Sequence, residues 1–231
     1  MFKHRATNPE RIDTGDYTPE EYQRFLREIR FINQRLGDQQ ALEKTLLSEI
    51  ERKGLKDFSV LDVGAGTGEL LGVIAEFARS NGIKVKLVGL DLNDLSVREI
   101  ASGSQRYNEI SPIQANALEL PFADGAFDYS LCSLFTHHLS DEQVPLVLKE
   151  MSRVARHGML VIDLERSVKA WLLYQLFCAA YRISPLVRQD GSLSIRKGFR
   201  VGELAEAAAV AGVKVDRELR VSPYRIVLRG R

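Results

Sequence analysis

Short apolar runs alternate with amphipathic stretches through the middle of the chain. Each run has about four to seven mostly apolar residues, the length of a strand that is buried on both faces. The stretches between them carry apolar residues at helical spacing. This alternation predicts an α/β fold with a doubly wound, mostly parallel sheet. The expected strands are residues 58–63, 85–90, 113–115, 127–132 and 159–162, and the expected helices are residues 69–80, 94–108 and 141–155.

The N-terminal part of the chain lies outside this alternation. Residues 1–18 are polar and predict a loose arm. The run Thr18-Pro19-Glu20-Glu21 then has the composition of a helix start, with a threonine cap, a proline in the first turn and acids near the positive end of the dipole. A second helix is expected over residues 38–53, because Gly54 follows it as a C-cap residue.

The C-terminal part also departs from the pattern. An alanine-rich helix over residues 202–211 precedes two closely spaced runs, 213–219 and 224–228, which predict a hairpin with an antiparallel strand at one end of the sheet. Residues 165–200 are too many for a simple crossover and predict an insertion at the carboxyl end of the sheet, where ligands bind in open α/β folds. Its first helix, residues 171–181, is apolar around most of its circumference, which fits ordinary core, a lid over a hydrophobic substrate, or a homodimer contact.

Length and charge narrow the class of protein. The 231 residues predict one large domain, and 32 basic against 31 acidic residues give a net charge of +1, which argues against a bulk nucleic-acid binder. Two cysteines are too few for a disulfide scaffold. The most apolar stretch, residues 168–181, is shorter than the roughly twenty residues of a membrane span, and no leader is apparent, so we expect a cytoplasmic protein. The expected parts are an N-terminal helical extension (1–57), a core (58–164), a lid-like insertion (165–200) and a C-terminal helix and hairpin (201–231).

A glycine-rich turn carries the first chemical signal. Gly64, Gly66 and Gly68 follow the first strand, where glycines allow a tight turn and close approach to a ligand. Their spacing is neither the dinucleotide fingerprint nor the phosphate loop, which disfavours an oxidoreductase. Asp62 precedes the turn, and Asp91 ends the second strand, where an acid can bind both ribose hydroxyls of a nucleoside.

With these residues, the chain resembles the class I S-adenosylmethionine-dependent methyltransferases. The run from Leu61 to Gly68 resembles the first motif of that family, and Asp91 matches its ribose-binding acid, with Leu92 beside the adenine. Asn116-Ala117 resembles the Asp-Ala pair that receives the adenine, and residues 120–128 resemble the family's LPF-x-D-x-x-FD run. The resemblance implies a Rossmann-like sheet of seven strands, S-adenosylmethionine as cofactor and S-adenosylhomocysteine as product. The expected cofactor-binding residues are Asp62, Gly64, Ala65, Gly66, Gly68, Asp91, Leu92, Asn116, Ala117 and Cys132.

Two adjacent histidines follow the fourth strand, on the side where the cofactor's methyl group is expected. His137 and His138 are the candidate catalytic residues, since an imidazole can take a proton near neutral pH and a phenolate is a better nucleophile than a phenol. One of them can instead hold the loop. No metal is expected, because adjacent histidines do not share a helix face and no acidic cluster accompanies them. Asp163, at the end of the fifth strand, either touches the substrate or caps the strand.

The sequence also resembles a narrower bacterial group related to the ubiquinone and menaquinone methyltransferases and linked to phenolic polyketides. The resemblance includes residues 133–142, 150–156 and 163–167. It implies direct SN2 transfer of a methyl group to a small aromatic or hydrophobic acceptor, with a phenolic hydroxyl favoured. The alternatives are a C-methyltransferase of a quinone-like ring, a nucleic-acid or protein methyltransferase, and a non-catalytic cofactor-binding module. A homodimer is compatible with the apolar insertion.

Overall fold

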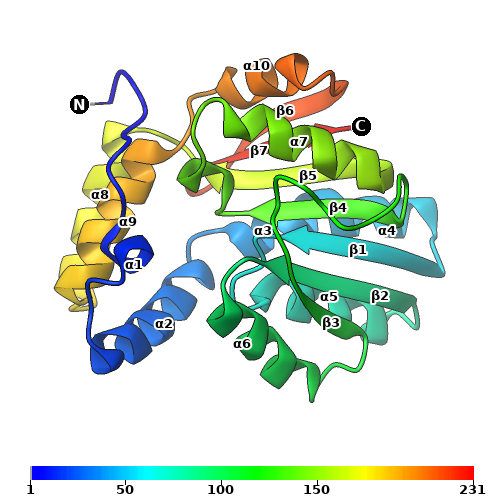
Figure 1. Ribbon diagram of the computed structural model, residues 1–231, viewed down its shortest axis with the longest axis horizontal. Helices are drawn as coiled ribbons and strands as arrows, with labels where there is room; N and C mark the ends of the chain where they lie inside the picture. Colours follow the sequence, from blue (N-terminus) through cyan, green and yellow to red (C-terminus); the bar gives the residue numbers. More distant parts are fainter. Residues whose placement is uncertain (1) are drawn as a thin grey trace.

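A mixed sheet forms the centre of the computed structural model, which describes residues 2–231 apart from the Asp13 side chain. Within this range the sheet has seven strands in the order β3-β2-β1-β4-β5-β7-β6, and β7 runs antiparallel to both of its neighbours (Figure 1). The predicted α/β fold with an antiparallel C-terminal strand is therefore confirmed. The strands are β1 (Asp57–Val63), β2 (Lys84–Asp91), β3 (Ile110–Gln114), β4 (Phe127–Ser133), β5 (Ala155–Leu164), β6 (Val215–Val221) and β7 (Arg225–Gly230).

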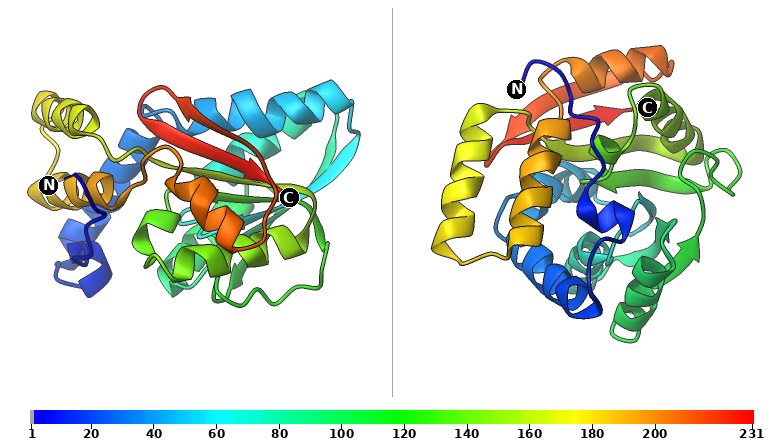
Figure 2. Two further views of the ribbon diagram at one scale, coloured as in Figure 1. Left: turned by 90° about the horizontal axis from the view of Figure 1, so that it is seen from above. Right: turned by 60° about the vertical axis from the view of Figure 1, so that its left-hand side comes forward.

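Helices cover both faces of the sheet, which explains why its strands lack polar alternation. On β1, Val60 and the adjacent Leu61 are both fully buried, yet they pack into different cores on opposite faces. One face is covered by α7 (Gln143–Val154) and α10 (Glu203–Val210). The other face is covered by α5 (Glu69–Ser80), α6 (Asp94–Ser104) and the helical residues 38–53 (Figure 2).

The N-terminal extension is helical, as predicted. Helix α2 (Pro19–Asn33) starts with a capping box, in which the Thr18 hydroxyl accepts the Glu21 N–H at 3.2 Å and the Glu21 carboxylate accepts the Thr18 N–H at 2.9 Å. A continuous helical stretch then consists of α3 (Asp38–Leu42), the π-helix η1 (Glu43–Leu47) and α4 (Ser48–Lys53). It ends at Gly54, in the left-handed region at φ 62°.

The insertion forms two helices beyond the carboxyl ends of the parallel strands. These are α8 (Val168–Ala180) and α9 (Pro185–Lys197), and they lie beside α1 (Arg11–Thr14) and α2 at that edge of the sheet (Figure 1). A third core joins them, with Ile32 of α2 buried against Tyr174 and Val187 of the insertion. Among the described residues, no helix is long and apolar enough to cross a bilayer.

The N-terminal arm is not loose, and the prediction for residues 1–18 was wrong for the part that the structure describes. The Ala6 N–H donates to the Arg196 carbonyl at 3.1 Å, and the main-chain N–H groups of Arg11 and Ile12 both donate to the Asp190 carboxylate at 3.0 Å. These partners lie about 180 positions along the chain, so no local pattern of polarity could reveal them.

A buried ion pair joins the helical extension to the C-terminal hairpin. The Arg225 guanidinium binds both carboxylate oxygens of Asp38, at 2.5 and 3.1 Å, and both side chains are buried. Asp38→Ala leaves a buried cation without its partner, so we expect unfolding in urea to show a loss of about 3–5 kcal/mol. The control is Asp216→Ala, which breaks a largely exposed pair with Arg231 and should cost less than about 1 kcal/mol. Equal losses in both variants would contradict this role.

Candidate active site

A cavity of about 1190 Å³ opens at the carboxyl ends of β1, β2 and β4. Its walls come from the glycine turn after β1, the end of β2, the loop after β4, and the helices of the extension and insertion. The cavity therefore lies at the topological switch point of the sheet, where β1 has β2 on one side and β4 on the other.

The glycine turn must consist of glycine for two separate reasons. Gly64, Gly66 and Gly68 all lie in the left-handed region, with φ between 55° and 75°. In addition, a Cβ atom on Gly64 would clash with the Phe135 ring, which packs directly on the turn. The backbone at Gly64 thus packs against Phe135 without room for a side chain. The glycine turn and the loop after β4 together form one wall of the cavity.

Two carboxylates flank the turn and differ in their partners. Asp62 is fully buried, and its Oδ1 atom has no hydrogen-bond partner in the described structure. Burial, reinforced by the nearby charge of Asp91, raises the pKa of Asp62 to about 7. Asp91 instead accepts the N–H groups of Gly66 and Asn93, each at 2.9 Å, while burial raises its pKa. A buried carboxylate with a bare oxygen suits a ligand that brings a cationic donor, such as an α-ammonium group.

His137 is held in one orientation by Asp163. Its Nδ1 atom lies 2.7 Å from Oδ1 of Asp163, and its main-chain N–H donates to Oδ2 at 3.0 Å. The Thr136 hydroxyl donates to the same Oδ2 at 2.5 Å. Burial opposes ionisation of Asp163, but the His137 charge and these hydrogen bonds outweigh it and lower the pKa of Asp163 to about 2. With Nδ1 bound, Nε2 of His137 is the ring nitrogen left for the cavity that this residue lines.

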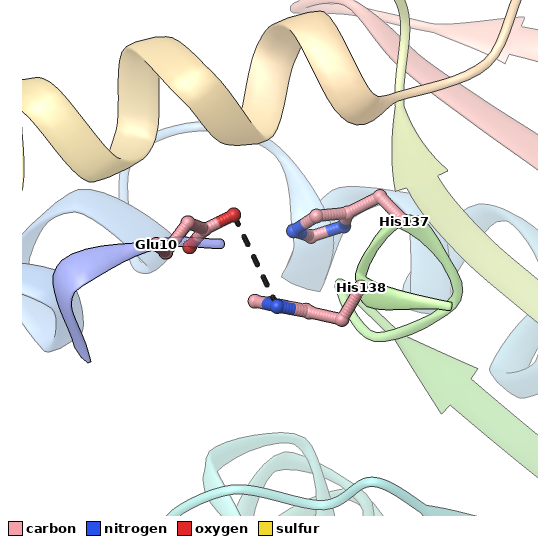
Figure 3. Close-up of side chains that lie close together, drawn as sticks. All are labelled: Glu10, His137 and His138. Atoms are coloured by element: carbon pink, nitrogen blue, oxygen red, sulfur yellow. Dashed lines mark ion pairs between the residues drawn. The ribbon is translucent and has the colours of Figure 1, made fainter. Parts of the chain in front are cut away.

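The arm brings an acid to the histidines. The His137 and His138 rings lie 4.3 Å apart, and Nδ1 of His138 is 3.9 Å from Oε1 of Glu10 (Figure 3). The potential ligand atoms of the three residues all lie within 4.8 Å of one another. Our expectation of no metal rested on two reasons, and one of them, the absence of an acid beside the histidines, does not hold. However, the buried Glu10 carboxylate is already neutralised by Lys197 at 3.2 Å and accepts the Ser194 hydroxyl at 3.0 Å, so the expectation stays a prediction.

Arg5 fixes the arm over the same loop. Its guanidinium donates to the carbonyls of His137 at 3.2 Å and Leu139 at 2.9 Å, and it pairs with Asp141 at 2.6 Å. Guanidinium groups suit such multiple contacts because their donors form a rigid fork. The loop that carries the histidines is therefore held by Asp163 at the end of β5 and by Arg5 of the N-terminal arm.

The structure brings some of the predicted site residues together and leaves others outside the cavity walls. Cys132 is fully buried, and burial raises the pKa of its thiol well above the usual value. Ala117 is also buried, and the Asn116 side chain accepts the N–H of Leu118 at 3.0 Å within its own turn. Leu92 is 67% exposed beside Asp91. Lining the cavity are Asp62, Gly64, Ala65, Gly66, Asp91, His137 and His138; Gly68, Leu92, Asn116, Ala117 and Cys132 do not line it.

The far end of the cavity is apolar and aromatic, and sequence reasoning missed it. Tyr17 and Tyr22 stack with their ring centroids 5.2 Å apart, and Phe25 of α2 and Phe177 of α8 face the same space. The apolar face of α2 was visible as a helical period, but the period does not say what the face contacts. Glu10 carried no signal, because its partners are distant in sequence.

Comparison with known proteins agrees with this geometry. Residues 60–158 match the family described as Methyltransferase domain. A demethylmenaquinone methyltransferase from Bacillus pumilus is 37% identical over 125 residues, which are 54% of this chain and 51% of that protein. The Bacillus subtilis protein of the same name is 34% identical over 127 residues, with 54% and 51% covered. The chain thus matches about half the length of these relatives.

Two solved structures share the fold over most of the chain. An S-adenosylmethionine-dependent methyltransferase from Aquifex aeolicus superposes with a TM-score of 0.59 at 21% identity, covering 81% of this chain and 87% of the other. The magnesium protoporphyrin IX methyltransferase of Synechocystis with bound S-adenosylhomocysteine gives a TM-score of 0.64 at 16% identity, covering 92% and 94%.

The sheet order, the glycine turn and the family match define a Rossmann-like methyltransferase fold. Residues 60–158 thus match a methyltransferase domain, the chain is similar to the quinone methyltransferases over about half of its length, and its fold is that of S-adenosylmethionine-dependent methyltransferases. The expected resemblance and cofactor are confirmed, whereas the roles of individual site residues stay predictions.

We expect Asp62 to make the affinity of the cavity for a cationic ligand depend on pH. If its carboxylate receives the ammonium group of S-adenosylhomocysteine, protonation below its pKa of about 7 removes the attracting charge. We expect the affinity, measured by calorimetry, to fall by about tenfold per pH unit below that value. 5′-Methylthioadenosine, which lacks the amino-acid group, should show no such slope. Asp62→Asn should remove the slope for S-adenosylhomocysteine, and an unchanged slope in that variant would overturn the assignment.

Asp91 should contribute to cofactor affinity through the ribose. Asp91→Ala removes an acceptor for the two hydroxyls and also the bond that holds Gly66, so we expect binding of S-adenosylhomocysteine to weaken by about 1–3 kcal/mol. Asp94→Ala is the control, since Asp94 is an exposed acid three residues away that pairs with Arg98 on its own helix. A folded Asp91→Ala variant with parental affinity would exclude this role.

Proposed function

We propose that the protein transfers the methyl group of S-adenosylmethionine to an oxygen atom of an aromatic or otherwise hydrophobic small molecule. The observation that carries this proposal is that one cavity contains both the glycine turn and the oriented imidazole of His137. A group able to take a proton thus faces the same space as the cofactor-binding turn. Such an arrangement suits an acceptor whose nucleophile must be deprotonated.

Different residues bind the cofactor and accept the proton of the acceptor. Bound S-adenosylmethionine supplies a methyl group on a sulfonium, which an acceptor oxygen can attack in line. Asp62 and Asp91 hold the polar ends of the cofactor, and Nε2 of His137 receives the proton of the acceptor hydroxyl. The hydrogen bond to Asp163 selects the neutral tautomer that carries its proton on Nδ1 and accepts through Nε2, and the charge of Asp163 stabilises the imidazolium that forms.

The apolar end of the cavity supports a hydrophobic acceptor. Tyr17, Tyr22 and Phe177 offer aromatic faces to a flat ring, and the cavity extends well past the glycine turn. The relatives named for demethylmenaquinone support an acceptor with a quinone-like ring. A phenolic or hydroquinone hydroxyl is therefore the proposed site of methylation.

Methylation of a ring carbon is the second candidate, because the relatives are named for a quinone precursor. The product of isotope-labelled cofactor and a phenolic acceptor, analysed by carbon NMR, distinguishes a methyl ether from a ring methyl group. Nucleic-acid substrates fit less well, since the net charge is +1 and the far end of the cavity is apolar.

His137 is expected to affect turnover and not cofactor binding. His137→Asn removes the basic Nε2 while its amide can still donate to the buried Asp163, so the fold should persist. We expect kcat with a phenolic acceptor to fall by about 10²–10⁴, with the affinity for S-adenosylhomocysteine unchanged.

The matched control is His157→Ala, because His157 is a half-exposed histidine outside the cavity that faces Asp128. Parental turnover in His157→Ala and a large loss in His137→Asn would support the proposal. Parental turnover in both would reduce His137 to a residue that holds the loop. Binding of S-adenosylhomocysteine by a parent that turns over no acceptor would favour a non-catalytic cofactor-binding module.

A further inference from the structure

Helix α8 exposes an unusual concentration of apolar side chains. Five of the ten large apolar side chains that are exposed in the described structure lie within residues 168–181. Several recur at a spacing of four, so they share one side of the helix. We call these residues the α8 stripe; they are Val168, Leu172, Leu173 and Leu176.

The opposite side of α8 packs against the rest of the protein. Ala170, Tyr174 and Cys178 are buried in the third core against α2 and α9. Both figures of the whole chain place α8 at the outside of the molecule, with α9 between it and the sheet (Figures 1 and 2). The stripe is therefore a second apolar side on a helix whose core contacts are complete.

The stripe continues into the active-site cavity. Leu173 belongs to the stripe and also lines the cavity, together with Tyr174 and Phe177 of the same helix. A hydrophobic molecule can thus pass from the outer side of α8 to the aromatic end of the cavity along apolar side chains. The other wall of that end is the apolar face of α2, which includes Phe25 and Ile29.

The charge around the stripe has one sign. Residues 166–189 contain four basic residues and no acidic one, although the whole chain is nearly neutral. Arg166 is buried and paired with Glu203, whereas Lys169, Arg182 and Arg188 are exposed. Glu28 of α2 accepts the Ser184 hydroxyl and pairs with Arg24. An apolar stripe flanked by cations matches the surface of an anionic bilayer, where apolar side chains enter the interface and cations meet lipid phosphates.

We propose that the α8 stripe docks on an anionic phospholipid bilayer, and that the acceptor is an aromatic ring on an apolar chain that dissolves in that bilayer. The proposal rests on the function proposed above and adds the source of the acceptor. A second copy of the chain fits the stripe less well. A two-fold contact through α8 would bring Lys169 and Arg182 of both copies together, and the segment has no acid to compensate them.

The test is co-sedimentation with vesicles of phosphatidylcholine containing about 30% phosphatidylglycerol, compared with phosphatidylcholine alone. The parent should bind the anionic vesicles at least about tenfold more strongly, and the binding should weaken as salt rises from about 0.05 to 0.5 M. Leu172→Glu/Leu176→Glu should lower binding by about tenfold or more. Neither residue lines the cavity, and they are 50% and 66% exposed, so the fold and site should remain intact.

The chain offers a matched control in Leu146→Glu, because Leu146 is 51% exposed on α7, away from the stripe. This variant should bind vesicles as the parent does. No binding by the parent, or equal loss in the control, would overturn the proposal. Conversion of a dimer to a monomer by the double substitution, seen by light scattering without vesicle binding, would assign the stripe to a self-contact and also overturn it.

Activity assays separate this proposal from the one on which it rests. The double variant should keep parental binding of S-adenosylhomocysteine and parental turnover of a soluble short-chain phenol, while losing turnover of a long-chain phenol presented in vesicles. Equal turnover of the vesicle-borne phenol by parent and double variant would overturn docking alone. If the parent methylates neither phenol but binds vesicles, the proposed reaction fails and docking stands.

Discussion

Three carboxylates at one edge of the sheet, two of them fully buried and one partly buried, impose the main constraint on this site. Asp62, Asp91 and Asp163 end β1, β2 and β5, and parallel strands bring their carboxyl ends to the same edge. An isolated buried charge is costly, so each must be compensated or neutralised. Asp163 is compensated by His137 and Thr136, and Asp91 by backbone N–H groups, whereas Asp62 keeps a bare oxygen. Of these three carboxylates, Asp62 has the oxygen without a partner, and this residue lines the cavity, where a cationic ligand can pair with it.

The strands and the glycine turn could be predicted because they depend on local pattern. Residues 58–63 were expected as a strand and form most of β1, and the expected helix 69–80 is α5. Asp62, Asp91 and His137 could be found because motif spacing fixes their places on that fold. Boundaries were less accurate, since α6 ends at Ser104 and β5 begins at Ala155. Helix ends depend on tertiary contacts that a period does not encode.

The parts that could not be predicted depend on contacts between distant segments. The Glu10 carboxylate lies buried beside the histidines, where it pairs with the Lys197 ammonium and accepts the Ser194 hydroxyl. Asp163 was left between two roles, and the hydrogen bond to His137 that decides its position needs the loop geometry after β4. In the same way, the stripe on α8 was recognised as apolar, but only the packing of Tyr174 and Cys178 shows which side remains outside.

Docking of the arm has a consequence for the order of folding. Residues 5–12 find their partners among residues 190–197 and in the loop around His137, so this segment must wait for α9 to emerge. Contacts of such long sequence separation form late, because the loop they close is expensive in entropy. The strands β1 to β5 and the glycine turn precede α9 in the chain and can therefore assemble before the arm closes over the histidines. Until the arm closes, the chamber beside the glycine turn lacks the wall that carries Glu10.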